Sequence, residues 1–313
     1  MSPTILVIGA TGNTGKNVIC NLPYLIKSKN ENYRILGLTR SLNNPVSQDL
    51  VKLPHVEMQE KDWTTIDSNW LKEQGVVRVF IASHNMPHQF MDESTLHIAL
   101  LDAGVEYVVR ISTVAESVSP ISPLYYARTH WAIENLLSQP EFARLQWTSL
   151  QPNCFTETFL GPIASWVKQY QKTGKQEKLE LLLDADAHVG LVHPEDVGKV
   201  AANLLVLDDI KPHNQATYVL NGPEDVNGKK IVEAVEQFIG AKVQDVAFKD
   251  TRIMREFIKA AYSEKISDSI IGGLGGLWQG NFSSSKRPTS KEIMELAPPE
   301  LNIVDTLKAM VEK

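Results

Sequence analysis

The sequence predicts an α/β protein with a doubly wound parallel sheet. Across residues 4–153, short apolar runs alternate with segments of helical periodicity. The run at residues 76–82 is apolar enough to be buried on both faces, which is typical of a strand in a parallel sheet. The first run also ends in a glycine-rich turn that leads directly into a helical segment. Strands and helices that alternate in this way form a parallel sheet covered by helices.

The glycine-rich turn follows the predicted first strand, Thr4–Ile8. Its first glycine permits the sharp exit from the strand, its second lets the backbone approach a diphosphate, and its third lets the helix pack on the strand. The helix start offers free N–H groups and the positive end of the helix dipole to phosphate. An ordinary glycine loop is the alternative, but the surrounding strand and helix favour dinucleotide binding. The predicted binding residues are Gly9, Thr11, Gly12, Asn13, Thr14 and Gly15.

The remaining elements of the first half follow in regular order. Pro23 marks a break or a second start within the first helix. The sixth strand is stopped by its proline at the edge where a ligand would bind. The predicted strands after the first are 33–40, 56–62, 76–82, 107–112 and 146–153, and the predicted helices lie around 48–53, 68–73, 89–101 and 125–137.

The end of the second strand indicates which nucleotide is bound. An acidic residue there would hydrogen-bond the adenosine 2′-hydroxyl and would repel a 2′-phosphate. This strand ends instead in Arg40, followed by Ser41, and an arginine can form a charge-assisted pair with the phosphate. The sequence therefore predicts NADPH rather than NADH as the cofactor. A plain surface arginine is the alternative interpretation of Arg40.

The carboxyl ends of the next two strands are expected to line the same crevice. In a doubly wound sheet these ends meet at the ligand site. Asp62 and Trp63 are therefore expected near the adenine, and Ser83 and His84 nearer the diphosphate and ribose. The histidines in this part of the chain share no metal-like constellation in the sequence, so no metal site is predicted.

Length, composition and charge indicate an ordinary globular protein. The 313 residues, 43% hydrophobic and 22% charged, are enough for one large domain or two closely packed ones. The formal net charge of -6 argues against nucleic-acid binding, and neither a long apolar run nor a secretory signal pattern is present. We expect a cytoplasmic protein with small-molecule partners, no membrane contact, and an oligomeric state open between monomer and homodimer. Cys20 and Cys154 are expected to be reduced packing thiols.

The second half of the sequence has a different character. Short strands are predicted at 179–183 and 217–220, helices at 157–170, 250–261 and 291–296, and a short strand turning into a helix at 190–197. A glycine-rich segment at 272–278 is either a mobile substrate loop or a plain surface connection. The predicted organisation is a nucleotide-binding Rossmann domain at 1–153, completed by strands and a helix from about 190–220. A smaller mixed α/β substrate region is expected at 154–313.

Taken together, these segments resemble the NmrA-like branch of the atypical short-chain dehydrogenases/reductases, a branch common in fungi. The resemblance covers most of residues 1–210. It rests on the glycine turn, the end of the second strand and four later segments. These are Val109-Arg110-Ile111-Ser112, Tyr126-Ala127-Arg128-Thr129-His130, Leu150-Gln151-Pro152-Asn153 and His193-Pro194-Glu195-Asp196-Val197.

The resemblance implies a set of residues around the nicotinamide. It places a serine or threonine after the fifth strand, here Ser112 or Thr113, and a Tyr-x-x-x-Lys pair on the next helix. The tyrosine is kept as Tyr126, but His130 stands where lysine is expected. A mostly neutral histidine would lower the pKa of the tyrosine less strongly than a lysine does. Gln151, Pro152, Asn153 and Phe155 match the nicotinamide end, with a simple strand-end turn as the alternative.

Three functions remain open on this sequence. The first is an NADPH-dependent reductase of an imine, enone or carbonyl in a small, largely apolar specialised metabolite. The second is a redox-neutral isomerase or cyclase of such a metabolite, and the third is an NADP(H)-sensing regulator without turnover. Ser112, Glu116, Tyr126 and His130 are all expected near the crevice, which favours an enzyme. Tyr126 is the expected proton donor, with His130 orienting the ribose or relaying the proton, and Glu116 is the alternative acid.

Overall fold

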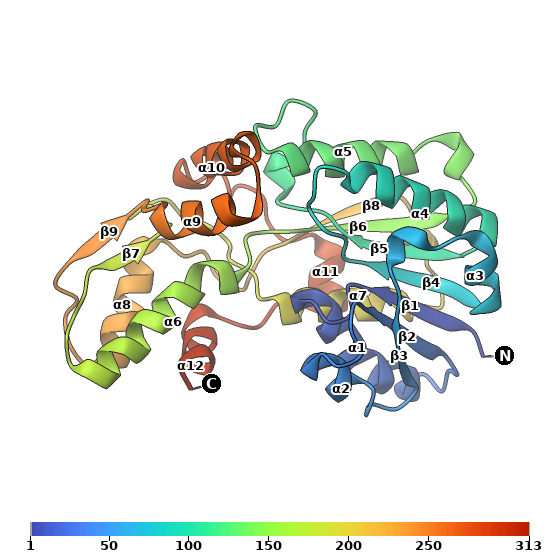
Figure 1. Ribbon diagram of the computed structural model, residues 1–313, viewed down its shortest axis with the longest axis horizontal. Coiled ribbons are helices and arrows are strands. Elements are labelled where there is room, and N and C mark those ends of the chain that lie inside the picture. Colours follow the sequence, from blue (N-terminus) through green and yellow to red (C-terminus); the bar gives the residue numbers. More distant parts are fainter. Residues whose placement is uncertain (1, 313) are drawn as a thin grey trace.

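A sheet of seven parallel strands forms the centre of the molecule (Figure 1). The computed structural model describes residues 2–312, except for the side chains of residues 253, 257, 259 and 261. The strands are β1 (Thr4–Ile8), β2 (Arg34–Thr39), β3 (Val56–Glu60), β4 (Val76–Ile81), β5 (Tyr107–Ile111), β6 (Gln146–Pro152) and β8 (Ala216–Leu220). Their order is β3-β2-β1-β4-β5-β6-β8, which confirms the predicted doubly wound α/β fold.

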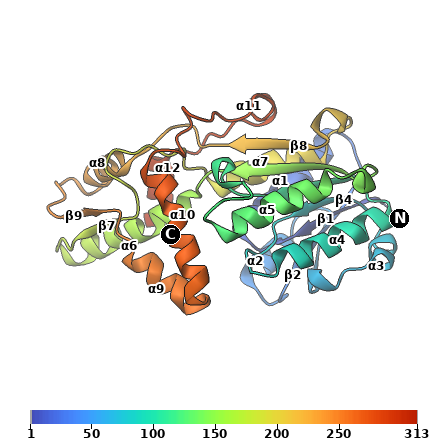
Figure 2. The same ribbon diagram turned by 90° about the horizontal axis from the view of Figure 1, so that it is seen from above.

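Helices cover both faces of this sheet (Figures 1 and 2). Alternate residues of a strand point to opposite faces, so Ile5 and Val7 pack in one core while Leu6 and Ile8 pack in another. One face is covered by α1 (Asn13–Ser28), α2 (Pro45–Leu50), α7 (Pro194–Leu205) and α11 (Lys291–Leu296). The other is covered by α3 (Ser68–Glu73), α4 (Gln89–Ala103) and α5 (Tyr125–Leu137).

The order of the strands determines where a ligand crevice is expected at the edge of the sheet. Going along the chain, β2 and β3 lie on one side of β1, and β4 lies on the other. Connections therefore leave β1 and β4 in opposite directions, and ligands of doubly wound sheets bind outside the carboxyl ends at this reversal point. Gly9 follows β1 and Ala82 follows β4 at this point.

A second region lies beyond the carboxyl ends of the strands (Figure 1). It has its own apolar core, in which Phe159, Leu181, Ile231, Leu274 and Leu307 are all buried. Its elements are α6 (Thr156–Thr173), β7 (Leu179–Leu181), α8 (Gly228–Ile239), β9 (Val246–Phe248), α9 (Arg252–Ala261), α10 (Glu264–Trp278) and α12 (Ile303–Glu312). The strands β7 and β9 pair in parallel as a separate small sheet. No helix within residues 2–312 is both long and apolar enough to cross a membrane.

Four expectations about individual segments were wrong. Pro23 neither breaks nor restarts α1, because buried residues on either side, such as Leu22 and Ile26, hold the helix against the sheet. The helix expected at 48–53 runs from Pro45 to Leu50, since Asn44 caps its first turn. Residues 190–192 form only an isolated bridge to Phe155, not a strand.

The fourth correction concerns the glycine-rich segment 272–278, which is neither a loop nor a surface connection. It forms the last two turns of α10. Gly273 packs directly on Leu124, where an added Cβ would lie 2.3 Å from the leucine Cδ2. The absence of a side chain at Gly273 therefore allows close helix packing.

Candidate active site

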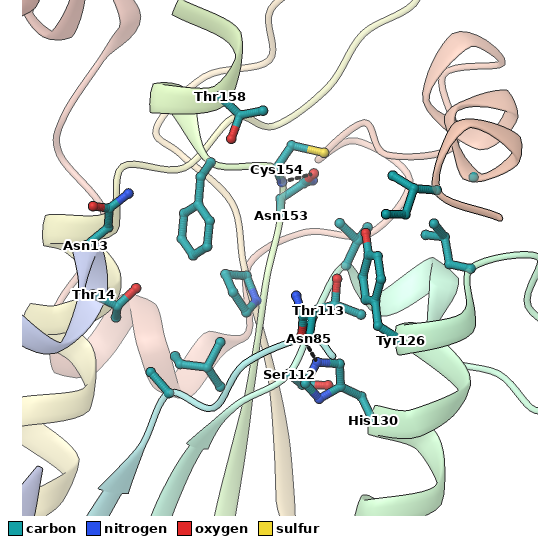
Figure 3. A pocket seen from close by; sticks show the side chains of 18 of the residues that line it. Asn13, Thr14, Asn85, Ser112, Thr113, Tyr126, His130, Asn153, Cys154 and Thr158 are labelled. Atoms are coloured by element: carbon teal, nitrogen blue, oxygen red, sulfur yellow. Dashed lines mark hydrogen bonds between the residues drawn. The ribbon is translucent and has the colours of Figure 1, made fainter. Parts of the chain in front are cut away.

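A cavity of about 520 Å³ opens at the carboxyl ends of the strands, between the sheet and the C-terminal region (Figure 3). This volume is within the range of small-molecule sites. The glycine turn forms one end of the cavity, and apolar side chains of α6 and α10, including Phe159 and Leu274, form the other. Tyr126 lies between these ends on α5.

The glycine turn has the backbone geometry of a phosphate cradle. Gly9 has φ +79°, and a Cβ there would lie 2.6 Å from the Ala82 carbonyl oxygen. A Cβ on Gly15 would lie 2.1 Å from the Gly9 carbonyl oxygen, so neither position accepts a side chain. Gly12 caps α1 without a side-chain hydrogen bond, and the first turn of α1 carries no acidic residue. Gly12, Asn13 and Thr14 line the cavity, so the uncapped start of α1 lies at its wall, which fits a diphosphate.

The other residues predicted for the glycine turn have separate positions. Asn13 and Thr14 line the cavity, whereas Thr11 does not belong to its described lining. The Asn13 amide donates a hydrogen bond of 2.7 Å to the Glu157 carboxylate on α6. This contact joins the phosphate turn to the C-terminal region across the cavity mouth.

A second cavity, of about 620 Å³, lies at the ends of β2 and β3. Its lining includes Arg40, Asp62 and Trp63, which the sequence analysis places around the adenosine, and also His84, which was expected nearer the diphosphate and ribose. Arg40 is exposed and forms no ion pair with the described residues, so its guanidinium is accessible to a phosphate. Ser41 follows Arg40 but is not among the described lining residues. The consecutive residues Ser83 and His84 line the first and the second cavity respectively, so the two cavities adjoin.

The second cavity also holds a cluster that the sequence did not reveal. One ligand atom from each of His84, His88 and Asp92 lies within 4.8 Å of the others. The His84 Nδ1 accepts a hydrogen bond from the Met86 backbone N–H at 3.2 Å, so its proton is on Nε2. That Nε2–H donates to the Asp92 carboxylate at 3.0 Å. His84 and Asp92 thus form a hydrogen-bonded pair within this cluster.

Tyr126 and Thr113 form the polar centre of the first cavity (Figure 3). Burial raises the pKa of the Tyr126 phenol, and the nearby Thr113 hydroxyl offsets only part of this effect. Of the two alternatives after β5, Thr113 is thus the residue next to the phenol. The Ser112 hydroxyl is buried and has no hydrogen-bond partner among the described residues. The neighbouring Tyr125 points away and donates to the Asn85 carbonyl oxygen.

His130 lies beneath the cavity in a buried polar network. Its Nδ1 is 2.8 Å from a guanidinium nitrogen of Arg110, and its Nε2 is 3.3 Å from the Asn85 side-chain oxygen. Burial and the Arg110 charge lower the pKa of His130 to about 3, although Glu93 opposes this shift. Burial alone would raise the pKa of Glu93, but Arg110 and His97 outweigh it and hold that pKa well below its usual value. The imidazole is therefore neutral near pH 7.

Of the remaining predicted residues, some line the first cavity and others do not. Glu116 is half-buried and lies 3.9 Å from the Arg287 guanidinium, outside the described lining, and burial raises its pKa. Gln151 is also outside the lining, because its amide donates to the Glu134 carboxylate. Pro152, Asn153 and Phe155 line the cavity.

Asn153 joins the two halves of the molecule. Its amide nitrogen donates to the Asn221 side chain at 2.7 Å and to the Phe282 carbonyl oxygen at 2.8 Å. Its side-chain oxygen accepts the Cys154 N–H at 2.8 Å (Figure 3). Both N–H groups of the Asn153 side chain are thus used in hydrogen bonds that fix the cavity wall.

Comparison with known protein families identifies the family of this chain. The model of the NmrA-like family matches residues 1–272 of the 313. The chain belongs to the NmrA-like family. No curated protein sequence gives a significant match.

Solved structures with a similar fold include reductases and an epimerase. The NADPH-dependent quinone oxidoreductase QOR2 from Escherichia coli, complexed with NADPH, is 17% identical with a TM-score of 0.73, covering 98% of this chain and 99% of that chain. The triphenylmethane reductase from Citrobacter sp., complexed with NADP(H), is 18% identical with a TM-score of 0.71 and the same two coverages. The UDP-glucuronic acid 4-epimerase from Bacillus cereus is 16% identical with a TM-score of 0.64, covering 99% of this chain and 98% of that chain. At these identities the similarity shows the fold.

Several residues of this NmrA-like cavity were missed by the sequence analysis. Asn85 lies just beyond β4, in a loop whose side-chain directions no local pattern determines. Leu274, Leu277 and Phe282 come from the C-terminal region, more than 100 residues after Tyr126. The helical spacing of Gly273, Leu274 and Leu277 is the one signal that could have indicated a helix face there.

Proposed function

We propose that this NmrA-like protein uses NADPH to reduce an imine, enone or carbonyl in a small, apolar specialised metabolite. The observation that carries the proposal is one cavity that runs from a phosphate-binding turn, past the Tyr126 phenol, to an apolar wall. A nucleotide whose diphosphate lies on Gly12 and Asn13 would place its nicotinamide toward Tyr126. The substrate would then lie between the nicotinamide and the apolar wall.

The choice of NADPH is supported by charge. Arg40 is accessible at the adenosine cavity, where a 2′-phosphate would form a charge-assisted pair with its guanidinium. Two of the structurally similar proteins contain NADPH or NADP(H). When bound, the cofactor supplies a hydride from its nicotinamide.

The polar centre fits a hydrogen-bonding role for Tyr126. Its raised pKa keeps the phenol protonated, so it donates a hydrogen bond to an acceptor atom in the cavity. The Thr113 hydroxyl lies near that phenol, and the Ser112 hydroxyl, which has no partner among the described residues, is available to the same acceptor or to the cofactor. Glu116, a half-buried carboxyl whose pKa is raised by burial, is the second candidate acid. Donors aimed at an oxygen or nitrogen that gains negative charge stabilise the transition state of hydride transfer.

The wall of the cavity supports an uncharged substrate. None of the described residues that line it is an aspartate, glutamate, lysine or arginine. The inner part is formed by Val114, Phe159, Ile270, Leu274 and Leu277. A charged sugar nucleotide would lose hydration there without gaining an ion pair, so an apolar metabolite is favoured.

The decisive test is incubation with NADPH and a panel of imines, enones and carbonyls, following nicotinamide absorbance and product mass together. We expect NADPH consumption and a product heavier by two hydrogens. A product of unchanged mass without NADPH consumption would instead indicate an isomerase or cyclase. Binding of NADPH without any product would indicate a sensor, and either outcome would overturn the reductase proposal.

Tyr126→Phe tests the proposed donor. Loss of the phenol hydroxyl should lower turnover by about 10²- to 10⁴-fold, the usual range for general acid assistance, with NADPH affinity nearly unchanged. Steady-state kinetics and calorimetry measure the two quantities. If Tyr126→Phe keeps the native rate while Glu116→Gln loses it, the acid is the carboxylate.

A further inference from the structure

We propose that Arg110 is a positioning residue that fixes His130 as a neutral N–H donor and thereby turns the Asn85 amide N–H toward the ligand in the cavity. The inference deepens the proposed reductase function and rests on it for its kinetic consequences. Its structural part concerns hydrogen-bond directions and is testable without a substrate.

The chain of hydrogen bonds starts at a guanidinium that can only donate. Arg110 is fully buried on β5. Its Nε donates to Glu93 at 2.7 Å, one Nη donates to the Ser149 hydroxyl at 3.0 Å, and the other donates to the His130 Nδ1 at 2.8 Å. Because an arginine carries no acceptor, the His130 Nδ1 must present its lone pair. The proton of the neutral imidazole is therefore on Nε2.

The position of the His130 proton determines the orientation of the Asn85 side-chain amide. The His130 Nε2–H points at the Asn85 side-chain oxygen, 3.3 Å away. Because the His130 Nε2–H is a donor, the Asn85 atom that faces it must be the amide oxygen. The amide nitrogen of Asn85 therefore faces away from His130. Figure 3 shows that nitrogen directed into the cavity, and it has no hydrogen-bond partner among the described residues. Asn85 is thus a ligand-binding residue, and its partner is an acceptor oxygen or nitrogen of the cofactor or substrate.

The charged groups around His130 keep the imidazole neutral, with its proton on Nε2. The charged groups around the imidazole are Arg110 on β5, Glu93 on α4, and Glu134 on the same helix as His130. Glu93 and Glu134 both pair with Arg110, at 2.7 and 3.6 Å, and neither carboxylate is bonded to the imidazole. Burial and Arg110 keep the pKa of His130 at about 3, so the imidazole stays neutral through the physiological range.

This arrangement differs from the lysine that the resemblance expects at position 130. A lysine would bring its own positive charge into the cavity. Here the positive charge lies on Arg110, which is buried beneath His130. The His130 imidazole and the Asn85 amide, each with a fixed hydrogen-bond direction, connect Arg110 to the cavity surface. His130 therefore acts as a spacer with a fixed tautomer and cannot relay a proton, because Arg110 does not release one.

Nitrogen NMR of protein labelled with ¹⁵N in histidine tests the tautomer directly. His130 is assigned by the resonance that disappears in His130→Gln. We expect one proton-bearing nitrogen, Nε2, and one bare nitrogen, Nδ1, unchanged from pH 5 to pH 8 with and without NADPH. A proton on Nδ1, or a titration of His130 in this range, would overturn the proposal.

Variants of Arg110 test its role. Arg110→Lys keeps a positive charge for Glu93 but has no second arm for His130, so the imidazole should become a tautomer mixture. If that variant does not fold, the double variant Glu93→Gln/Arg110→Met removes both buried charges together and makes the same prediction. Ser149→Ala is the matched control, because it removes a different Arg110 hydrogen bond and should keep the Nε2–H tautomer. An unchanged tautomer in the Arg110 variants would contradict the positioning role.

Asn85→Asp tests the ligand contact. The carboxylate still accepts the His130 Nε2–H but offers no donor to the cavity, so the tautomer should stay fixed while the affinity for NADPH or the substrate KM worsens by at least tenfold. Unchanged affinity and KM would refute Asn85 as a ligand-binding residue. If no substrate is reduced but the NMR results and the NADPH effect hold, only the proposed reductase function fails.

Discussion

At the scale of single residues, charge and hydrogen-bond direction distinguish the nucleotide site from the site around Tyr126. Arg40 is exposed and lies at the adenosine cavity, where it can meet a phosphate. Arg110 is completely buried and is bonded to Glu93, Ser149 and His130. The exposed arginine is therefore free to pair with an anionic ligand, as we propose for NADPH, whereas the buried one is already bonded to its neighbours.

Arg40→Ala should weaken NADPH binding and leave NADH binding nearly unchanged. The lost charge-assisted pair is worth about 1.5–3 kcal/mol, or roughly a 10- to 150-fold rise in Kd. Titration calorimetry of both nucleotides measures the difference. Arg144→Ala is the matched control, since it removes an exposed arginine outside both cavities and should change neither affinity. Equal affinities of the native protein for NADPH and NADH would contradict the role of Arg40.

His130 should make the folded state sensitive to mild acid. Its folded pKa of about 3 is below the unfolded value near 6.5, so between these values the unfolded chain binds a proton that the folded chain does not. The free energy of unfolding therefore falls as pH drops below about 6.5, by up to about 1.4 kcal/mol per pH unit for this group. Burial lowers the pKa of His97 as well, with the same sign.

The measurement is urea unfolding between pH 6.5 and pH 5. His130→Gln should show a smaller decrease of the free energy of unfolding over this interval than the native protein does. Ser149→Ala keeps both buried histidines and should retain the native pH dependence. An identical slope in His130→Gln would show that His130 is not the neutral group described here.

At the scale of elements, α10 can pack closely enough to form a wall of the first cavity because it is glycine-rich. Gly273 meets Leu124 at the start of α5, whereas Gly272 on the same helix has open space around it. The leucine is buried, so it has little room to move. Two adjacent glycines of one helix thus have different structural roles, one in packing and one at the surface.

Gly273→Ala and Gly272→Ala should therefore have opposite effects on stability. The Cβ at 273 would be 2.3 Å from the Leu124 side chain, and relieving such overpacking costs about 1–3 kcal/mol, more than the gain in helix propensity. The exposed Gly272→Ala should stabilise the protein by up to about 1 kcal/mol. Thermal and urea unfolding measure both changes. Stabilisation by Gly273→Ala would show that α10 does not pack against Leu124 as described.

At the scale of the whole molecule, the C-terminal region lies beyond the carboxyl edge of the sheet (Figure 2). Residues of both halves line one cavity. Asn153 at the end of β6 is bonded to Asn221 and to the Phe282 carbonyl. Asn13 and Glu157 form a second link, across the phosphate turn. The C-terminal region is thereby held to the sheet by buried as well as exposed hydrogen bonds.

Asn153→Ala should loosen this connection. The substitution leaves the Asn221 side-chain oxygen and the Cys154 N–H without their partner and removes one of the two hydrogen bonds to the Phe282 carbonyl, which keeps the Gly190 N–H; an unsatisfied buried group costs about 1–3 kcal/mol. Urea unfolding without nucleotide should show a loss of at least this size. Asn135→Ala, which removes an exposed asparagine bonded only within α5, should change stability by less than about 0.5 kcal/mol. A loss no greater in Asn153→Ala than in this control would refute the linking role.

The sequence by itself determined the alternation of strands and helices in residues 4–153 and the phosphate turn between them. These features are local: apolar periodicity reports which faces are buried, and Gly9 and Gly15 occupy positions where the backbone leaves no room for a Cβ. The helix of 125–137 and its pair Tyr126 and His130 followed from the same local reasoning.

Only the tertiary structure decided which of these groups meet. It brought Thr113 rather than Ser112 to the Tyr126 phenol, made a helix of 272–278, and set Arg110 against His130. Each outcome depends on how segments distant in the chain pack together, and Asn153 and Phe282 are 129 residues apart. Hydrogen-bond partners and tautomers are properties of that packing, so a sequence pattern predicts the residues of the site but not the direction of their hydrogen bonds.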